Sequence, residues 1–253
     1  MTGNLLLRGM IAGLLAGILA FSFAKVFGEP SVEQAINFEA TMAHNHDHGD
    51  SAAGEEEELV SRGVQSSIGL LTGVVVYSTS IGGIFALVFA FSMGRLGSIK
   101  IGPRGLAAAL ALLAFISVVL VPALKYPANP PSVGDPETIR QRTKLFFLMV
   151  VVSLAALVAA INVFRKLMGR LYGWASITVA AVFYVVIMAI AADVFPVINE
   201  VPEGFSASLL WNFRIASLGI HAVVWTTLGL VFGWLAQGPV LAPRNRHNAR
   251  LQS

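Results

Sequence analysis

Six long apolar runs constrain the fold of this chain more than any other feature. They cover residues 5–27, 65–93, 105–124, 145–164, 174–195 and 215–236, and each contains at least 20 residues. A helix needs about 20 mostly apolar residues to cross a bilayer, and only helices satisfy every backbone hydrogen bond within one lipid-embedded segment. The runs do not alternate between apolar and polar residues, as the strands of a membrane barrel would. The sequence therefore predicts an all-α, polytopic membrane helix bundle of about six transmembrane helices, with residues 1–253 forming a single integral membrane domain.

The composition excludes an ordinary soluble domain. Only 12% of the residues are charged, whereas soluble domains average about 25%. The chain contains no cysteine, which excludes disulfides and thiolate metal sites. It also contains neither a phosphate-binding glycine-rich loop nor the signatures of metalloproteases and serine hydrolases. We therefore expect a membrane protein that is not an enzyme and has no catalytic residues.

Charged residues are separated by sign on the two sides of the predicted bundle. If the N-terminus lies in the cytoplasm, one side carries ten basic residues and no acidic residue, and all 14 carboxylates fall on or beside the other side. Basic residues favour the cytoplasmic side of a membrane protein. We therefore expect a multi-pass protein of the cell membrane with cytoplasmic N- and C-termini and a basic cytoplasmic tail at residues 237–253. Because the basic residues are spread over short loops, the pI near 9.4 does not indicate nucleic-acid binding.

The longest predicted outer loop, residues 28–64, is rich in histidine and acidic residues. Its centre reads His44-Asn45-His46-Asp47-His48, and Asp50 and four glutamates at 55–58 follow. Imidazole and carboxylate groups bind divalent transition metals. In an extended segment the three imidazoles point the same way, whereas in a helix only His44 and His48 share a face. The pattern fits metal capture outside the membrane and a merely solvated polar loop about equally well.

Ionisable residues in or beside the apolar runs are further candidates, because charged groups in lipid are costly and are usually functional. Glu29 lies at the start of the long loop, Asp193 precedes the third outer loop, Arg214 opens the last apolar run, and His221 lies about two turns deeper in the same run. For Glu29 and Arg214, anchoring at the membrane interface is favoured over a functional role. His221 is equally expected to form a hydrogen bond to a neighbouring helix.

The first apolar run has two interpretations. A basic residue, an apolar stretch and small residues near its end are compatible with a cleaved signal peptide. Glycines at positions 9, 13 and 17 favour a retained helix instead, because small residues at spacing four let membrane helices approach closely.

Several longer motifs resemble those of the CbtA family of predicted cobalt transporter subunits. They are LLRGMIAGLLAG at 6–17, VFGEP at 26–30, GIFALVFA at 83–90, KYPANPPSVG at 125–134 and, most specifically, PVINEVP at 196–202 with LWNFRIASLG at 210–219. The resemblance covers nearly the whole chain, although the family is described with about five spans. It implies a membrane subunit with cobalt(II) as substrate, no permanently bound cofactor, and a small, one-span, histidine-rich CbtB-like partner subunit. The residues that match the family's motifs are Glu29, Asn129, Asn199, Glu200 and Arg214, all predicted at the outer face.

The leading hypothesis is therefore uptake of cobalt, or less specifically of nickel or cobalt. The expected metal ligands are His44, His46, His48, Asp47, Asp50, Glu29 and Glu200, and the expected pathway residues are Asn129, Asp193, Asn199, Arg214 and His221. The alternative is a non-transporting membrane scaffold or assembly protein. If Glu200 is not a ligand, it is expected to pair with Arg214 and to hold the third outer loop against the last span.

Overall fold

A computed structural model describes residues 2–46, 60–95, 101–135 and 137–241 of the chain, apart from the side chains at 43–46 and 239–241. These residues form helices and no strands, and six continuous helices are long and apolar enough to cross a membrane. They are Thr2–Met42, Arg62–Ser92, Pro103–Lys125, Ile139–Leu167, Gly173–Val194 and Ala207–Gly238. The predicted all-α bundle with six spans is confirmed, and the chain is a multi-pass membrane protein.

Four of the six spans contain a short π-helical segment, labelled η. The first span consists of α1 (Thr2–Phe23), η1 (Ala24–Gly28) and α2 (Glu29–His46), and the second of α3 (Arg62–Val64), η2 (Gln65–Gly69) and α4 (Leu70–Ser92). The third consists of α5 (Pro103–Ala114), η3 (Phe115–Leu120) and α6 (Val121–Lys125), and the fourth and fifth are α7 (Ile139–Leu167) and α8 (Gly173–Val194). The sixth consists of α9 (Ala207–Thr227), η4 (Leu228–Phe232) and α10 (Gly233–Leu241). A π-helical turn shifts the faces of the helix on its two sides and is frequent at functional sites.

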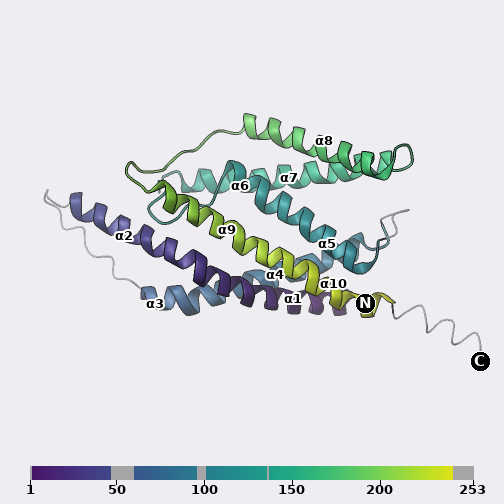
Figure 1. The fold of residues 1–253 in the computed structure, drawn as a ribbon, viewed down its shortest axis with the longest axis horizontal. Helices are drawn as coiled ribbons and strands as arrows, with labels where there is room; N and C mark the ends of the chain where they lie inside the picture. The colour runs from purple at the N-terminus through teal and green to yellow at the C-terminus, as the bar shows by residue number, and fades with distance from the viewer. Residues whose placement is uncertain (1, 47–59, 96–100, 136, 242–253) are drawn as a thin grey trace, which may run out of the picture.

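The first helix is much longer than the first apolar run. It stays continuous over the 41 residues Thr2–Met42, which gives a length of about 60 Å, twice the hydrocarbon thickness of a bilayer. The start of the predicted outer loop 28–64 is therefore the helix α2, which projects beyond the bundle (Figure 1). Ala35 and Phe38 on one side of α2 pack against Phe205 and Leu209.

Glycine brings α1 and α4 into close contact along their lengths. A Cβ atom built on Gly13 would lie 2.8 Å from Thr79 Cα, and one built on Gly82 would lie 2.9 Å from Gly13 Cα. Both distances are shorter than an ordinary carbon–carbon contact, so only glycine fits. The glycine pattern therefore marks a helix–helix interface, and α1 packs as an integral span of the bundle.

Two hydrophobic clusters divide the six spans. The larger cluster joins α1, α4, α5 and the last span, which consists of α9, η4 and α10. We call these elements together the four-span body. The second cluster joins α7 to α8, which we call the helix pair, and residues of the outer half of the third span pack against it. Figure 1 shows α8 at one edge of the molecule, beyond α7, and α1 and α4 near the opposite edge. The third span is therefore the element shared by the two groups.

The start of α1 and the end of α10 lie at the same end of the bundle (Figure 1). Arg8 near the start of α1 donates a hydrogen bond to the carbonyl oxygen of Leu235 in α10. An even number of spans requires this arrangement, and it agrees with termini on one side of the membrane. The cytoplasmic assignment of that side rests on the distribution of charge and stays a prediction.

Candidate cation site at the outer face

Residues 126–135 and 137–138, which we call the strap, lie across the end of the bundle opposite the two termini. We call this end the outer face, as the charge distribution predicts. Pro130 and Val133 close a turn in which Ser132 has a φ of 64°, and a proline at the second position of such a turn presets its geometry. The hydroxyl of Tyr126 donates to the Pro196 carbonyl oxygen at 2.8 Å, and the Ser132 hydroxyl donates to the Ala35 carbonyl oxygen at 2.8 Å. The strap is thus a folded connector tied to α2 and to the third outer loop.

Glu200 in the third outer loop is fully engaged by donors from the strap and from α7. Its carboxylate accepts hydrogen bonds from the Thr138 hydroxyl, from the Asp135 backbone N–H at 3.1 Å and from Arg142 Nη1 at 2.8 Å. The Thr138 hydroxyl, helped by the Asp135 N–H and the Arg142 guanidinium, lowers the pKa of the Glu200 carboxyl below its ordinary value. The glutamate is therefore held in its ionised form, as a clamp between two loops.

Glycine makes room for this clamp. Gly134 has a φ of 139°, and a Cβ atom built on it would lie 2.6 Å from Arg142 Nη1. Any other residue would therefore strain the backbone and displace the guanidinium from Glu200. Gly134 ends the KYPANPPSVG motif, which gives that part of the motif a physical role.

Arg214 does not pair with Glu200, so the expected Glu200–Arg214 ion pair is wrong. Arg214 Nη2 instead donates to the Asn129 side-chain oxygen at 2.9 Å, and Arg214 Nε lies 3.4 Å from the Ala128 carbonyl oxygen. The sequence placed both charges at the outer face but could not tell which arginine reaches the carboxylate. Arg142, at the end of the first turn of α7, pairs with Glu200 instead.

A third arginine holds Glu29. Arg62 Nη2 of α3 lies 2.6 Å from Glu29 Oε2, and Lys25 donates to the Ser66 carbonyl oxygen at 3.0 Å. The oxygen ligands expected from Glu29, Asn129 and Glu200 are therefore each paired with an arginine side chain. A guanidinium therefore contacts an oxygen atom of each residue that a bound cation would need as a ligand.

The histidine segment lies far from these residues. His44 and His46 belong to the last turn of α2, and Asp47, His48 and Asp50 lie outside the described residues. At 1.5 Å per residue, the 15 residues from Glu29 to His44 place the two backbones about 22 Å apart. Within the described part of the chain, no three histidine, aspartate or glutamate residues are grouped so as to hold one metal ion.

The remaining pathway candidates occupy two depths. Asp193 and Asn199 are exposed at the outer face, at the end of α8 and in the third outer loop. His221 lies within α9, where its ring meets Tyr77 of α4 edge to face at 6.1 Å between centroids. The buried Nδ1 atom of His221 has no hydrogen-bond partner among the described residues. The predicted hydrogen bond from His221 to a neighbouring helix is therefore absent on that nitrogen.

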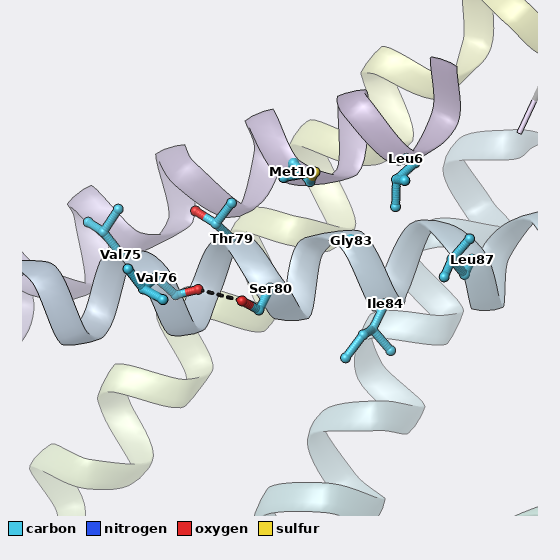
Figure 2. A pocket seen from close by; sticks show the side chains of 9 residues that line it. All are labelled: Leu6, Met10, Val75, Val76, Thr79, Ser80, Gly83, Ile84 and Leu87. Carbon is cyan, nitrogen blue, oxygen red and sulfur yellow. Dashed lines mark hydrogen bonds between the residues drawn. The ribbon is translucent and has the colours of Figure 1, made fainter. Parts of the chain in front are cut away.

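A groove along α1 and α4 is not suited to bind a metal ion. Figure 2 shows that it is lined by apolar side chains, among them Leu6, Met10 and Leu87, with Thr79 and Ser80 as its polar residues. The Ser80 hydroxyl donates to the Val76 carbonyl oxygen of its own helix at 2.8 Å. Lipid tails suit such a surface, and a divalent cation does not.

Sequence reasoning missed the residues that position Glu200. Nothing in the sequence marks Thr138 or Arg142 as a partner of Glu200, and Gly134 stands out only as the end of a motif. A glycine three residues after a double proline indicates a turn, and that signal was available. The pairing of Arg142 with Glu200 joins residues 58 positions apart, and nothing local in the sequence indicates it.

The comparisons with known proteins agree with the fold and with the motifs. The family described as "Probable cobalt transporter subunit (CbtA)" matches residues 2–237, a range that includes nearly all of the described helices. No curated protein and no solved structure matches the chain. The match covers far more than half of the sequence, and the chain belongs to the CbtA family of probable cobalt transporter subunits.

Proposed function

We propose that this chain is the membrane-embedded subunit of a cobalt(II) importer, or less specifically of a nickel(II) and cobalt(II) importer. The observation that carries the proposal is the family match over residues 2–237. A six-span bundle with acidic and amide groups at one face supports it. The role is transport and not catalysis, with the metal as substrate and no permanently bound cofactor. The family description as a subunit implies a partner, and we propose a small, one-span, histidine-rich CbtB-like protein.

The proposed route begins on the long outer loop. His44, His46 and His48, with Asp47 and Asp50, collect the hydrated cation outside the membrane. A divalent cation moving inward gains about 4.6 kcal/mol per 100 mV of membrane potential. This energy favours uptake once the cation reaches the spans.

The outer mouth is proposed to consist of Glu29, Asn129, Asn199 and Glu200, with Asp193 beside it. Oxygen ligands of this kind suit a borderline cation that must also be released. Because arginines occupy three of these groups, a cation has to compete with Arg142 for Glu200 and with Arg214 for Asn129. Deeper in the membrane, His221 is proposed as the next polar contact, since its Nδ1 atom has no partner among the described residues.

Cobalt accumulation in cells with and without this gene tests the proposal. We expect accumulation at limiting cobalt to fall several-fold when the gene is deleted and to return when it is supplied again. The matched site test compares Glu200→Gln with Glu203→Gln, which changes an exposed carboxylate in the same loop. Normal cobalt uptake per folded Glu200→Gln molecule would remove Glu200 from the route. Unchanged accumulation in the deletion strain would favour the scaffold role instead.

A further inference from the structure

The helix pair is attached to the rest of the molecule at one end only. In the half nearer the basic loops, α7 buries Ala156 and Ala160 in the cluster that it shares with α8. The main packing partner of α8 among the described elements is α7. In the outer half, α7 packs against η3 and α6 of the third span, and Ile116 and Val121 contribute to the shared cluster.

The third span changes partners at its π-helical segment. Before that segment, α5 packs against η4 and α10 of the four-span body, where Gly229 and Gly233 allow close approach. Within it, η3 packs on two sides, against α9 of the body, where Val119 joins the larger cluster, and against α7 of the helix pair. After it, α6 packs against α7. Pro122 follows two residues later, and proline removes a backbone hydrogen bond from a helix. The hydroxyl of Ser117 in this segment is fully buried and has no partner among the described residues. Interrupted hydrogen bonding of this kind is where a helix bends most easily.

At the outer face, polar contacts also connect the helix pair to the four-span body. The third outer loop is held to the four-span body by Phe205, which packs with Leu209 of α9 and with Ala35 of α2. Glu200 of the same loop binds Thr138 and Arg142 at the start of α7. These bonds join the helix pair to the body at the end opposite the basic loops. They are bonds to an ionised carboxylate, which are stronger than bonds between neutral groups and depend on the charge of Glu200.

We propose that α7 and α8 move as one unit against the four-span body, with η3 as the hinge and the Glu200–Thr138–Arg142 contacts as the latch. In the structure the latch is closed. Rigid movement of one helix group against another is a common way for membrane proteins to expose a central site to alternate sides. The inference concerns motion alone, so it holds whichever cation the protein carries.

Distances between spin labels test the proposal in the full-length protein in lipid nanodiscs without added metal. The chain has no cysteine, so labels can be placed by single substitutions. Phe91 of α4 and Val158 of α7 are exposed and lie in different groups. Phe91 with Leu230 reports on the body alone, and Val158 with Val182 reports on the helix pair alone.

Two variants are designed to open the latch. Glu200→Ala removes the carboxylate, and Gly134→Ala adds a methyl group in the space that Arg142 occupies. In both variants we expect the distance between the labels at Phe91 and Val158 to shift and broaden, while the two distances within each group stay unchanged. Glu203→Gln is expected to leave all three distances as they are. Two results overturn the proposal: an unchanged distance between the groups in both latch variants, or equal broadening of all three distances, which would mean general loosening.

Discussion

Replacing Gly82 with alanine measures how closely the first and second spans pack. The added methyl group would lie 2.9 Å from Gly13 Cα and would also meet the Gly9 carbonyl oxygen. Carbon atoms in contact prefer about 3.5–4.0 Å, so α1 and α4 must separate by roughly 0.6–1 Å. The neighbouring atoms belong to backbone, which cannot rotate away. Overpacking of this kind costs about 1–3 kcal/mol, and the better helix propensity of alanine returns up to about 1 kcal/mol.

Gly73→Ala is the matched control for this change. Gly73 lies on the same helix, and a Cβ atom built on it meets nothing within 4 Å. We expect Gly73→Ala to be neutral or stabilising by up to about 1 kcal/mol, because only helix propensity changes. For a chain of this size, a net loss of about 1–2 kcal/mol in Gly82→Ala corresponds to a melting temperature lower by roughly 2–8 °C.

The assay is thermal unfolding of both variants in one detergent, followed by tryptophan fluorescence or circular dichroism. The reasoning requires Gly82→Ala to melt clearly below the wild type and Gly73→Ala to melt at or above it. If the two alanine variants melt alike, the close contact between α1 and α4 is wrong. The glycine pattern would then reflect only the general abundance of glycine in membrane helices.

Three further predictions concern the outer face and the orientation. Because the pKa of Glu200 is lowered in the folded protein, its ionised form stabilises the fold at neutral pH. Thermal stability should therefore fall as the pH drops below about 4.5 and through the lowered pKa. The variant Glu200→Gln should show a weaker dependence of thermal stability on pH. Changing the three histidines of residues 44–48 to alanine should weaken Co²⁺ binding in calorimetry by about tenfold or more without lowering the melting temperature, and equal affinities would identify a merely solvated segment. A cysteine at Glu203 should react with a membrane-impermeant maleimide added to intact cells, whereas one at Arg170 should not; the reverse pattern would invert the orientation.

The span count was predictable because hydrophobicity acts on each segment separately. Twenty apolar residues must be buried in lipid whatever their neighbours do, so the six spans follow from local composition. The interface between α1 and α4 was partly predictable, since glycine at spacing four is a local signal. Which helix would face those glycines was not, because Gly82 lies 69 residues beyond Gly13 in the sequence.

The pairings at the outer face were not predictable for a different reason. Charge sorting placed Glu200, Arg142 and Arg214 on one side of the membrane, but each carboxylate had several arginines within reach of a flexible loop. The choice depends on backbone geometry, above all on the turn at Ser132 and the open position at Gly134. Such turns are set by the packing of Val133 against α2 and α9, which is a tertiary effect.

The helical structure of α2 separates two steps of the proposed route, cation capture near His44 and cation binding at Glu29. A flexible loop could have combined them. A flexible segment could carry a bound ion from His44 to Glu29, but a helix holds these residues about 22 Å apart. Capture at the histidines would then raise the local concentration of cations and would not hand the ion directly to the mouth. In the proposed route, the ion would then cross the remaining distance in water and compete with the arginines that hold Glu29, Asn129 and Glu200. Competition with Arg142 for Glu200 would also open the contact between α7 and the third outer loop, so binding at the mouth and release of the helix pair would be one event.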